Sequence, residues 1–400
     1  MTDAVAPAEV VTLGCRLNLA ESESIRTILA DAGTPTVVVN SCAVTAEAVR
    51  QSRRAVRRLR RSHPHARLVV TGCAATIEPD SFSAMAEVDA VVPNMAKADP
   101  LAWHPNAGET ASRQRPSEVH TRAFVPVQTG CDHACTFCII PQGRGPSLST
   151  PVADVLRVIE RHLLLGVNEI VLSGVDVTGW GADLPDAPRL GVLVRAILDA
   201  FPRLPRLRLS SLDGVEIDGL LFEIITGEAR VMPHVHLSLQ SGDDMVLKRM
   251  KRRHNRAQAV ELTDALRAAR PDIAIGADLI AGFPTETDAM HANNLAIVRD
   301  CGVVHGHVFP YSPRPGTPAA RMPQVAPVTV RVRAAEIRAA VADERARWLA
   351  SLVGAPREVL AERDGTGHSP EFAPYRLPEG TVAGTIVTLT PTRIIEGMLA

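Results

Sequence analysis

The 400-residue chain is 46% hydrophobic and 22% charged, so it can bury sizeable cores and is not a disordered protein. At about 150 residues per domain, its length predicts two or three domains. A formal net charge of −1 excludes a global polycation for gripping nucleic acid, and 3% aromatic residues argue against binding single strands mainly by base stacking. No apolar run reaches the roughly 18 residues of a membrane span, and no secretory signal is apparent, which predicts a cytoplasmic protein.

The first hundred residues alternate strand and helix signals. Helices are predicted at 18–32 and 44–62, and strands at 9–14, 36–40, 67–72 and 89–92. This alternation predicts an α/β domain over residues 1–104 with a doubly wound parallel sheet. Cys15, Cys42 and Cys73, the early trio, each follow one of the first three strands. Because open α/β sheets place their ligands at the carboxyl ends of strands, we expect these cysteines to converge.

A second α/β unit is predicted beyond a linker at 105–120, a stretch that is polar and rich in turn formers. Its strands are expected at 123–127, 169–174, 206–212, 234–240, 272–282 and 303–311. Helices are expected between them at 151–165, 190–200 and 258–269, with a closing helix at 328–351. Six such units favour a partial (β/α)6 barrel over 121–352, with its chemistry at the carboxyl rim of the strands.

The last segment, 353–400, changes character. Strand signals at 381–390 and 393–398, with Gly and Pro turns, predict a small C-terminal β module.

A compact cysteine motif directly follows the first predicted barrel strand: Cys131-Asp-His-Ala-Cys135-Thr-Phe-Cys138, the loop trio. Three thiolates this close can ligate one metal centre. A structural zinc site wants a fourth ligand, and His133 sits awkwardly for that role inside the short loop. A [4Fe–4S] cluster on three cysteines leaves one iron open, and compact cysteine runs are typical of iron–sulfur ligation. The spacing favours the cluster over zinc or coincidence.

The loop motif, with Phe137 before its third cysteine and IIPQGRG after it, resembles the signature of radical S-adenosylmethionine (SAM) enzymes. The flanks of the early trio resemble the N-terminal domain of methylthiotransferases: TLGCRLN, NSCAVT and VTGCAAT. Barrel segments are also similar to that family, with SSLDG in place of SSLEP and GFPTET in place of GFPGET as two departures. The resemblance covers essentially the whole chain. It is closest to the branch that acts on N6-threonylcarbamoyladenosine (t6A) in tRNA.

This resemblance implies a SAM-binding [4Fe–4S] cluster on the loop trio and an auxiliary [4Fe–4S] cluster, which delivers sulfur, on the early trio. It implies a transferase that converts t6A at position 37, in the tRNA anticodon loop, to its 2-methylthio derivative. One SAM would methylate sulfur, and a second would yield the radical that activates adenine C2. A radical route suits this C2–H bond, which offers little to acid–base groups, and the cofactor carries the hard step. The sulfur and electron donors stay unidentified, and no membrane partner is expected.

Further site residues are predicted with less specific signals. Ser211, Gln240 and Asp278 lie near the predicted rim and could hydrogen-bond the ribose and carboxylate of SAM. Cys301 lies away from that rim and is interpreted as a packing residue. The C-terminal module resembles the RNA-binding TRAM domain, and RNA contact there is implied by resemblance alone.

The predicted helix at 44–62 carries an arginine stripe at helical spacing, formed by Arg50, Arg53, Arg54, Arg57, Arg58 and Arg61. Val49, Val56 and Leu59 lie on the neighbouring face and can pack on the sheet. Guanidinium forks suit phosphate, so the stripe predicts an RNA-backbone contact. The alternative is a solvated face, although no acidic partners follow at i+4 within the stripe.

Two alternative functions stay open. The same methylthiolation could act on isopentenyladenosine in tRNA or on an aspartate of a ribosomal protein. A protein of another class, an RNA-binding protein that uses its cysteines for structural metal and has no catalysis, would hold zinc without iron.

Overall fold

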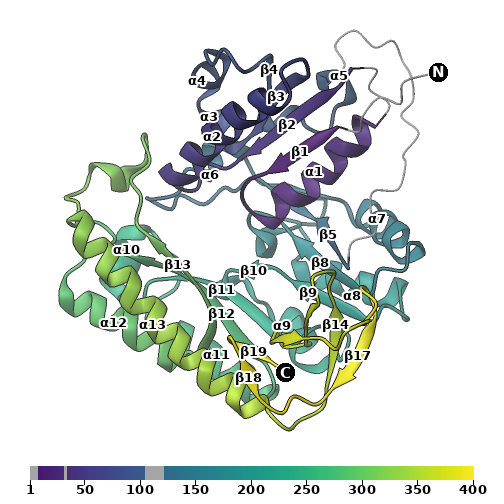
Figure 1. Ribbon diagram of the computed structural model, residues 1–400. Helices are drawn as coiled ribbons and strands as arrows, with labels where there is room; N and C mark the ends of the chain where they lie inside the picture. The colour runs from purple at the N-terminus through teal and green to yellow at the C-terminus, as the bar shows by residue number, and fades with distance from the viewer. Residues whose placement is uncertain (1–7, 31–33, 104–120) are drawn as a thin grey trace.

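A computed structural model of the chain describes residues 8–30, 34–103 and 121–400. Three regions follow one another in Figure 1: an N-terminal α/β domain (purple to dark blue), a barrel domain (teal to green) and a C-terminal β module (yellow). The predicted linker at 105–120 lies outside the described residues. None of the described helices combines the length and apolar character needed to span a membrane.

The N-terminal domain is built on four parallel strands in chain order: β1 (Glu9–Thr12), β2 (Thr36–Ser41), β3 (Arg67–Gly72) and β4 (Ala90–Val92). Its helices are α1 (Arg16–Ile28), α2 (Ala46–Ser62), α3 (Cys73–Ile77), α4 (Pro79–Ser83) and α5 (Pro100–Trp103). Both faces of the sheet are covered, because alternate residues of a strand point to opposite sides. Val37 and Val39 pack with residues of α2, whereas Val38 packs with Ile25 of α1.

The barrel domain has two parallel sheets. One contains β5 (Arg122–Pro126), β8 (Glu169–Ser173) and β9 (Arg206–Leu209). The other contains β10 (Ser211–Leu212), β11 (His234–Gln240), β12 (Ala274–Ala281) and β13 (Val303–Pro310). Only Ser210 separates β9 from β10. The predicted six strand units of a partial barrel are therefore confirmed.

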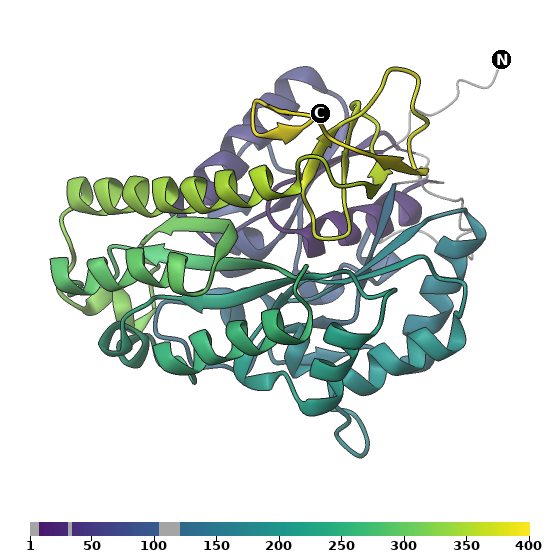
Figure 2. The same cartoon turned by 90° about the horizontal axis from the view of Figure 1, so that it is seen from below.

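Helices cover the outside of the barrel (Figure 2), and the long α13 leads into the C-terminal module. They are α7 (Val152–Leu164), α8 (Leu190–Ala200), α9 (Gly219–Gly227), α10 (Asp244–Met250), α11 (Arg256–Ala269), α12 (Asp288–Asp300) and α13 (Pro327–Leu352). Between β5 and α7 lie β6 (Gln128–Thr129), α6 (Ile140–Arg144) and β7 (Leu148–Ser149). Short 3-10 turns are η1 (Asn94–Ala96), η2 (Val177–Gly179), η3 (Gly214–Glu216) and η4 (Pro318–Arg321).

Along the barrel strands, apolar residues on one face alternate with polar residues on the other. Residues such as Ile170, Leu207 and Val235 join the apolar core beneath the outer helices. Their neighbours in sequence, such as Glu169 and Arg208, point to the other face. The inner face of the barrel is therefore polar, which suits a binding surface better than a core.

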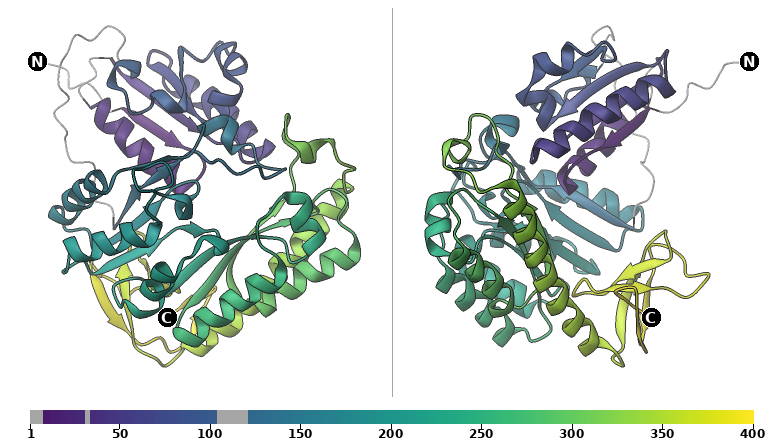
Figure 3. Two further views of the ribbon diagram at one scale, coloured as in Figure 1. Left: turned by 180° about the vertical axis from the view of Figure 1, so that it is seen from behind. Right: turned by 60° about the vertical axis from the view of Figure 1, so that its left-hand side comes forward.

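The C-terminal module is a six-stranded sheet in the order β17-β14-β15-β16-β19-β18. Its strands are β14 (Arg357–Ala361), β15 (Thr366–His368), β16 (Pro374–Arg376), β17 (Ile386–Leu389), β18 (Ile394–Ile395) and β19 (Met398–Leu399). The small β module is confirmed, but the sequence missed β14, β15 and β16. Strands of three to five residues carry too little alternation to be recognised. From behind, the N-terminal domain lies above the barrel and the module below it (Figure 3).

Candidate active site

The loop trio lies between β6 and α6, directly after Gly130. Gly130 has φ +72°, and a Cβ there would lie 1.7 Å from the carbonyl oxygen of Pro146, so only glycine fits this turn. Two N–H groups point at the sulfur atoms. The backbone N–H of His133 donates to Sγ of Cys131 at 3.4 Å, and Arg252 donates to Sγ of Cys135 at 3.6 Å. Donors of this kind stabilise the anionic sulfur of cluster ligands.

The spacing of the sulfur atoms tests whether the three cysteines of a trio could bind a single metal ion. A zinc ion at about 2.3 Å from each thiolate holds its sulfur atoms within about 4.6 Å of one another. Among the described residues, neither cysteine trio gathers its three sulfur atoms within 4.8 Å. In this arrangement, neither cysteine trio converges on one shared ion.

His133 has partners of its own. Its Nε2 lies 2.8 Å from Asp176 and 3.1 Å from Arg253, and the hydrogen bond to Asp176 raises its pKa. Around the loop, the ligand atoms of Cys131, His133 and Asp176 lie within 4.8 Å of one another, as a single ion would require; the described residues offer a second such group in His236, Asp278 and His307. The other two cysteines of the loop trio stand outside that group.

The first and last cysteines of the loop trio are half-buried. Burial raises the pKa of the Cys131 thiol to about 12 and that of Cys138 to about 11. These thiols are therefore protonated at neutral pH without metal. Metal binding must release their protons, which couples cluster assembly to pH.

The early trio converges at one edge of the N-terminal sheet. Cys15 precedes α1, Cys42 follows β2, and Cys73 begins α3. A Cβ on Gly14 would lie 3.1 Å from the Cβ of Cys42, so Cys15 and Cys42 share this corner. Burial, and then the charges of Cys73 and Cys15, raise the pKa of Cys42. The Nδ2 of Asn94 lies 3.5 Å from Sγ of Cys73, a further donor to sulfur.

The two trios face one another across the boundary between the domains. α6, which follows the loop trio, lies beside α3 (Figure 1), and a Cβ on Gly143 would lie 3.2 Å from the Cβ of Cys73. The buried Arg144 fixes this contact through Oε1 of Glu21 at 2.7 Å and Oδ1 of Asn18 at 2.7 Å. Burial opposes its charge, but Cys73 and Glu21 outweigh that effect and raise the pKa of Arg144.

The predicted rim residues take different positions. Ser211 begins β10, and Gln240 ends β11 with φ +66°. Asp278 lies within β12, where His236 and His307 hydrogen-bond to its Oδ1 at 3.0 and 3.1 Å. Burial opposes ionisation of Asp278, but these two hydrogen bonds prevail and lower its pKa.

The sequence did not single out His236 and His307. His236, Asp278 and His307 lie on the neighbouring strands β11, β12 and β13, and only the strand register of the structure shows that they meet on the inner face. Gly276 opens the space for His236, since a Cβ there would lie 2.4 Å from its Nδ1.

A second polar group on the inner face was also missed. The fully buried Glu169 accepts from Arg122 at 2.7 Å and from Arg208 at 2.9 Å, and Arg206 lies 3.8 Å away. Burial opposes ionisation of Glu169, but Arg208 and then Arg122 lower its pKa to about 2. These four residues lie near the starts of three different strands and are far apart in sequence, apart from Arg206 and Arg208.

The arginine stripe on α2 is less free than the sequence indicated. Val49, Val56 and Leu59 are buried as predicted. However, acidic partners come from outside the stripe: Glu47 pairs with Arg50 and Arg54, Glu78 with Arg53 at 2.7 Å, and Glu87 with Arg57 at 3.9 Å. The sequence showed no acidic partner at i+4 within the stripe, and for these four arginines the acids come from positions outside it. Within the described residues, Arg58 and Arg61 have no ion pair.

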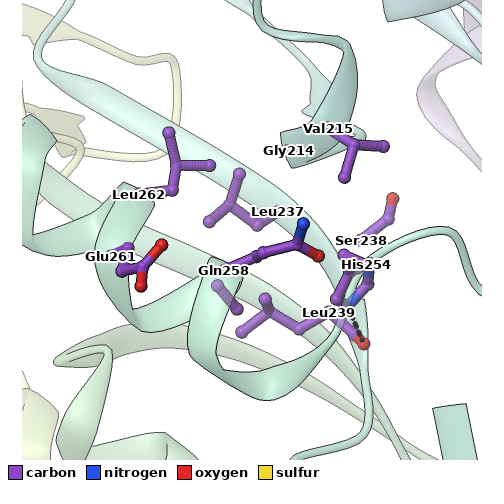
Figure 4. A pocket seen from close by; sticks show the side chains of 10 residues that line it. Gly214, Val215, Leu237, Ser238, Leu239, His254, Gln258, Glu261 and Leu262 are labelled. Carbon is purple, nitrogen blue, oxygen red and sulfur yellow. Dashed lines mark hydrogen bonds between the residues drawn. The ribbon is translucent and has the colours of Figure 1, made fainter. Parts of the chain in front are cut away.

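Two further features lie outside the site. Cys301 follows α12 and is fully buried, consistent with packing. A cavity of about 470 Å³ lies between β11 and α11 and is lined by residues such as Leu239, His254 and Gln258 (Figure 4). All seven cysteines are described, and none lines this cavity.

Comparison with known proteins agrees with this geometry. A model of the radical SAM superfamily matches residues 125–295, and a model of an uncharacterised protein family, UPF0004, matches residues 8–93. The chain is 42% identical to the threonylcarbamoyladenosine tRNA methylthiotransferase MtaB of Rickettsia prowazekii, covering 98% of this chain and 96% of the relative. It is 32% identical to the tRNA-2-methylthio-N6-dimethylallyladenosine synthase of Paracoccus denitrificans, covering 90% and 87%.

A solved structure shares the fold. The radical SAM methyltransferase TsrM of Kitasatospora setae superposes with a TM-score of 0.56 at 13% identity, covering 78% of this chain and 74% of that one. The likeness supports the barrel architecture only. The near full-length relatedness at 42% identity, with the two cysteine trios in place, decides the family. This chain belongs to the radical SAM threonylcarbamoyladenosine tRNA methylthiotransferases.

Proposed function

We propose that this protein converts t6A at position 37 of tRNA, beside the anticodon, to 2-methylthio-t6A. One observation carries the proposal: the contact of Gly143 with Cys73 places the loop trio and the early trio on either side of one domain boundary. Sulfur held at one trio must reach a base activated at the other. The packing of α3, which begins with Cys73, against α6, which follows the loop trio, keeps the two trios near one another and supports such a transfer.

The chain's own residues hold this arrangement. As a family member the protein uses SAM and [4Fe–4S] clusters, and we assign the SAM-binding cluster to the loop trio and an auxiliary one to the early trio. When bound, these groups supply the electron transfer and the sulfur chemistry that adenine C2 requires. Arg252 and Asn94 donate N–H groups to the sulfur atoms of Cys135 and Cys73. The Arg144–Glu21 ion pair locks the two domains together.

Substrate binding is distributed over the other predicted residues. We assign Ser211, Gln240 and Asp278 to SAM. For Asp278, the inner-face position supports this, and its hydrogen bonds to two histidines fix the carboxylate in place. On α2, Arg58 and Arg61 are the members of the stripe with no ion pair to any described residue, which makes them the best candidates for phosphate contacts of the anticodon loop.

Nucleoside mass spectrometry of tRNA from cells with and without this gene tests the proposal. We expect loss of 2-methylthio-t6A with accumulation of t6A. Loss of 2-methylthio-isopentenyladenosine instead would move the substrate to that of the Paracoccus relative. An unchanged tRNA profile would overturn the tRNA proposal and favour a ribosomal-protein target.

Metal analysis separates the enzyme from a binding protein that uses structural metal. The anaerobically purified protein is expected to carry roughly eight irons, as two [4Fe–4S] clusters require. Zinc without iron would overturn the catalytic assignment.

A further inference from the structure

We infer that Arg16 binds the carboxylate of the threonyl group of t6A and thereby selects this base over unmodified adenosine. This inference rests on the proposed function and names a residue for its substrate specificity. The threonylcarbamoyl group carries a free carboxylate, which neither adenosine nor isopentenyladenosine possesses. A site specific for t6A therefore needs a cation within reach of the base.

Arg16 occupies a suitable position. It directly follows Cys15 of the early trio and is the first residue of α1. Its guanidinium lies over two rings from separate regions, 5.8 Å from the centroid of Phe124 on β5 and 5.7 Å from that of Phe372 in the C-terminal module. The N-terminal domain, the barrel and the module therefore meet at this side chain, next to the predicted point of sulfur delivery.

Arg16 has no anionic partner. Across the described residues it makes no hydrogen bond and no ion pair, although its side chain remains exposed to solvent. The neighbouring Arg122 and Arg208 each have an anionic partner. Arg122 pairs with Glu169 and Glu362, and Arg208 pairs with Glu169 and donates to the carbonyl of Pro370.

The surroundings favour an incoming anion. The guanidinium groups of Arg122 and Arg208 lie 5.4 and 4.8 Å from the centroid of the Phe372 ring that Arg16 also covers, so positive charge gathers at this point. A carboxylate bound at Arg16 would also be attracted by these neighbouring cations. Charge-assisted, bidentate contacts are the strong interactions that Arg forms with carboxylates.

The backbone conformation of Phe372 is an independent indication of a ligand site. Phe372 adopts φ +72°, a conformation that bulky residues rarely take, and its ring also lies 4.8 Å from the guanidinium of Arg208. Such strain persists only where the surroundings enforce it, and it gathers at ligand sites. The ring of Phe372 therefore contacts the guanidinium groups of both Arg16 and Arg208.

The test is a binding comparison with the cluster-loaded, full-length enzyme. Two copies of one tRNA are used, one carrying t6A and one carrying adenosine, and the Kd of each is measured. We expect the wild type to prefer t6A, and Arg16→Met to lose about 10- to 100-fold of that preference while its Kd for the adenosine tRNA stays unchanged. Arg16→Lys should restore part of the preference. Arg161→Met, which removes an exposed charge from α7, is the matched control and should keep it.

A change on the tRNA side avoids dependence on the folding of a variant. Methyl esterification of the threonyl carboxylate should weaken binding to the wild type by the same factor as Arg16→Met. It should add nothing to the loss in Arg16→Met, because both changes remove one interaction. Unchanged binding of the ester would overturn the inference.

The remaining outcomes are separable. Equal weakening of both tRNAs by Arg16→Met would assign Arg16 to a phosphate and overturn the carboxylate inference. If Arg16→Met lowered the melting temperature but kept the full preference for t6A, the role of Arg16 would be limited to packing between the domains. That result would also overturn the inference. If the wild type neither prefers nor methylthiolates t6A, the proposed function itself fails. If the wild type does both and Arg16→Met keeps the preference, only the inference fails.

Discussion

Gly143 and Cys73 touch across the boundary between the barrel and the N-terminal domain, where a Cβ on the glycine would lie 3.2 Å from that of the cysteine. The first residue follows the loop trio by a few positions, and the second belongs to the early trio. The distance between the two predicted cluster sites is therefore set by the absence of a side chain. A larger residue at 143 must push α6 away from α3.

Gly143→Val is expected to uncouple the two trios. The loop trio is untouched, so cleavage of SAM to 5′-deoxyadenosine should continue, while formation of 2-methylthio-t6A should fall at least about 100-fold, since misplacement by about 1 Å can cost that much. Chromatography with mass spectrometry measures both products. Gly227→Val is the control, since a Cβ on Gly227 at the end of α9 meets open space. Normal methylthiolation by Gly143→Val would refute the role given to this contact.

Removal of one cysteine from each trio should abolish different steps of the reaction. Cys131→Ala is expected to abolish formation of 5′-deoxyadenosine, whereas Cys73→Ala should retain it and lose the methylthio product. Each variant should drop from about eight irons to about four. Cys301→Ala, at a fully buried cysteine outside both trios, should keep the iron of the wild type. If Cys131→Ala still produced 5′-deoxyadenosine, the ligand assignment would be wrong.

Glu169 should make the stability of the barrel depend on acid. Its pKa is about 2 in the folded chain against an ordinary value of 4.5, so the ionised form stabilises the fold. This contribution is complete above about pH 4.5 and is lost as the pH falls toward 2, at a cost on the order of 3 kcal/mol. Denaturant unfolding of the cluster-free protein from pH 7 to pH 3 measures it.

Glu169→Gln should remove that pH dependence. It leaves the buried Arg206 and Arg208 without their carboxylate, so a loss of about 3–5 kcal/mol at pH 7 is expected. Glu160→Gln on the exposed face of α7 serves as the control and should change stability little. An equal pH profile for Glu169→Gln and the wild type would contradict the assignment.

The free arginines of α2 should bind tRNA through its phosphates. Arg58→Met and Arg61→Met are expected to weaken t6A tRNA and unmodified tRNA equally, because phosphate contacts carry no base information. The slope of log K against log salt should shrink by roughly 0.7 to 0.9 for each arginine lost. Arg157→Met on α7 provides a charge-matched control. An unchanged slope in both variants would assign the stripe to a solvated face.

The sequence alone predicted the two groups of cysteines that the chemistry requires. The spacing of Cys131, Cys135 and Cys138 is local, so the sequence alone predicts that three thiols of a single loop share one centre. The strand-end placement of Cys15, Cys42 and Cys73 follows from β/α alternation, because parallel strands end at one edge of a sheet. Both predictions depended on short-range order, and the structure places the residues accordingly.

Tertiary structure decided what surrounds these centres. Nothing local to Arg16 indicates Phe372, which lies hundreds of positions away in the chain, nor the ion pairs that leave Arg16 as the unpaired cation of its group. In the same way, Glu78 and Glu87 neutralise part of the α2 stripe from other segments. Side-chain charge can be read from sequence, but whether a charge is paired depends on distances between segments, and these are fixed only when the domains pack.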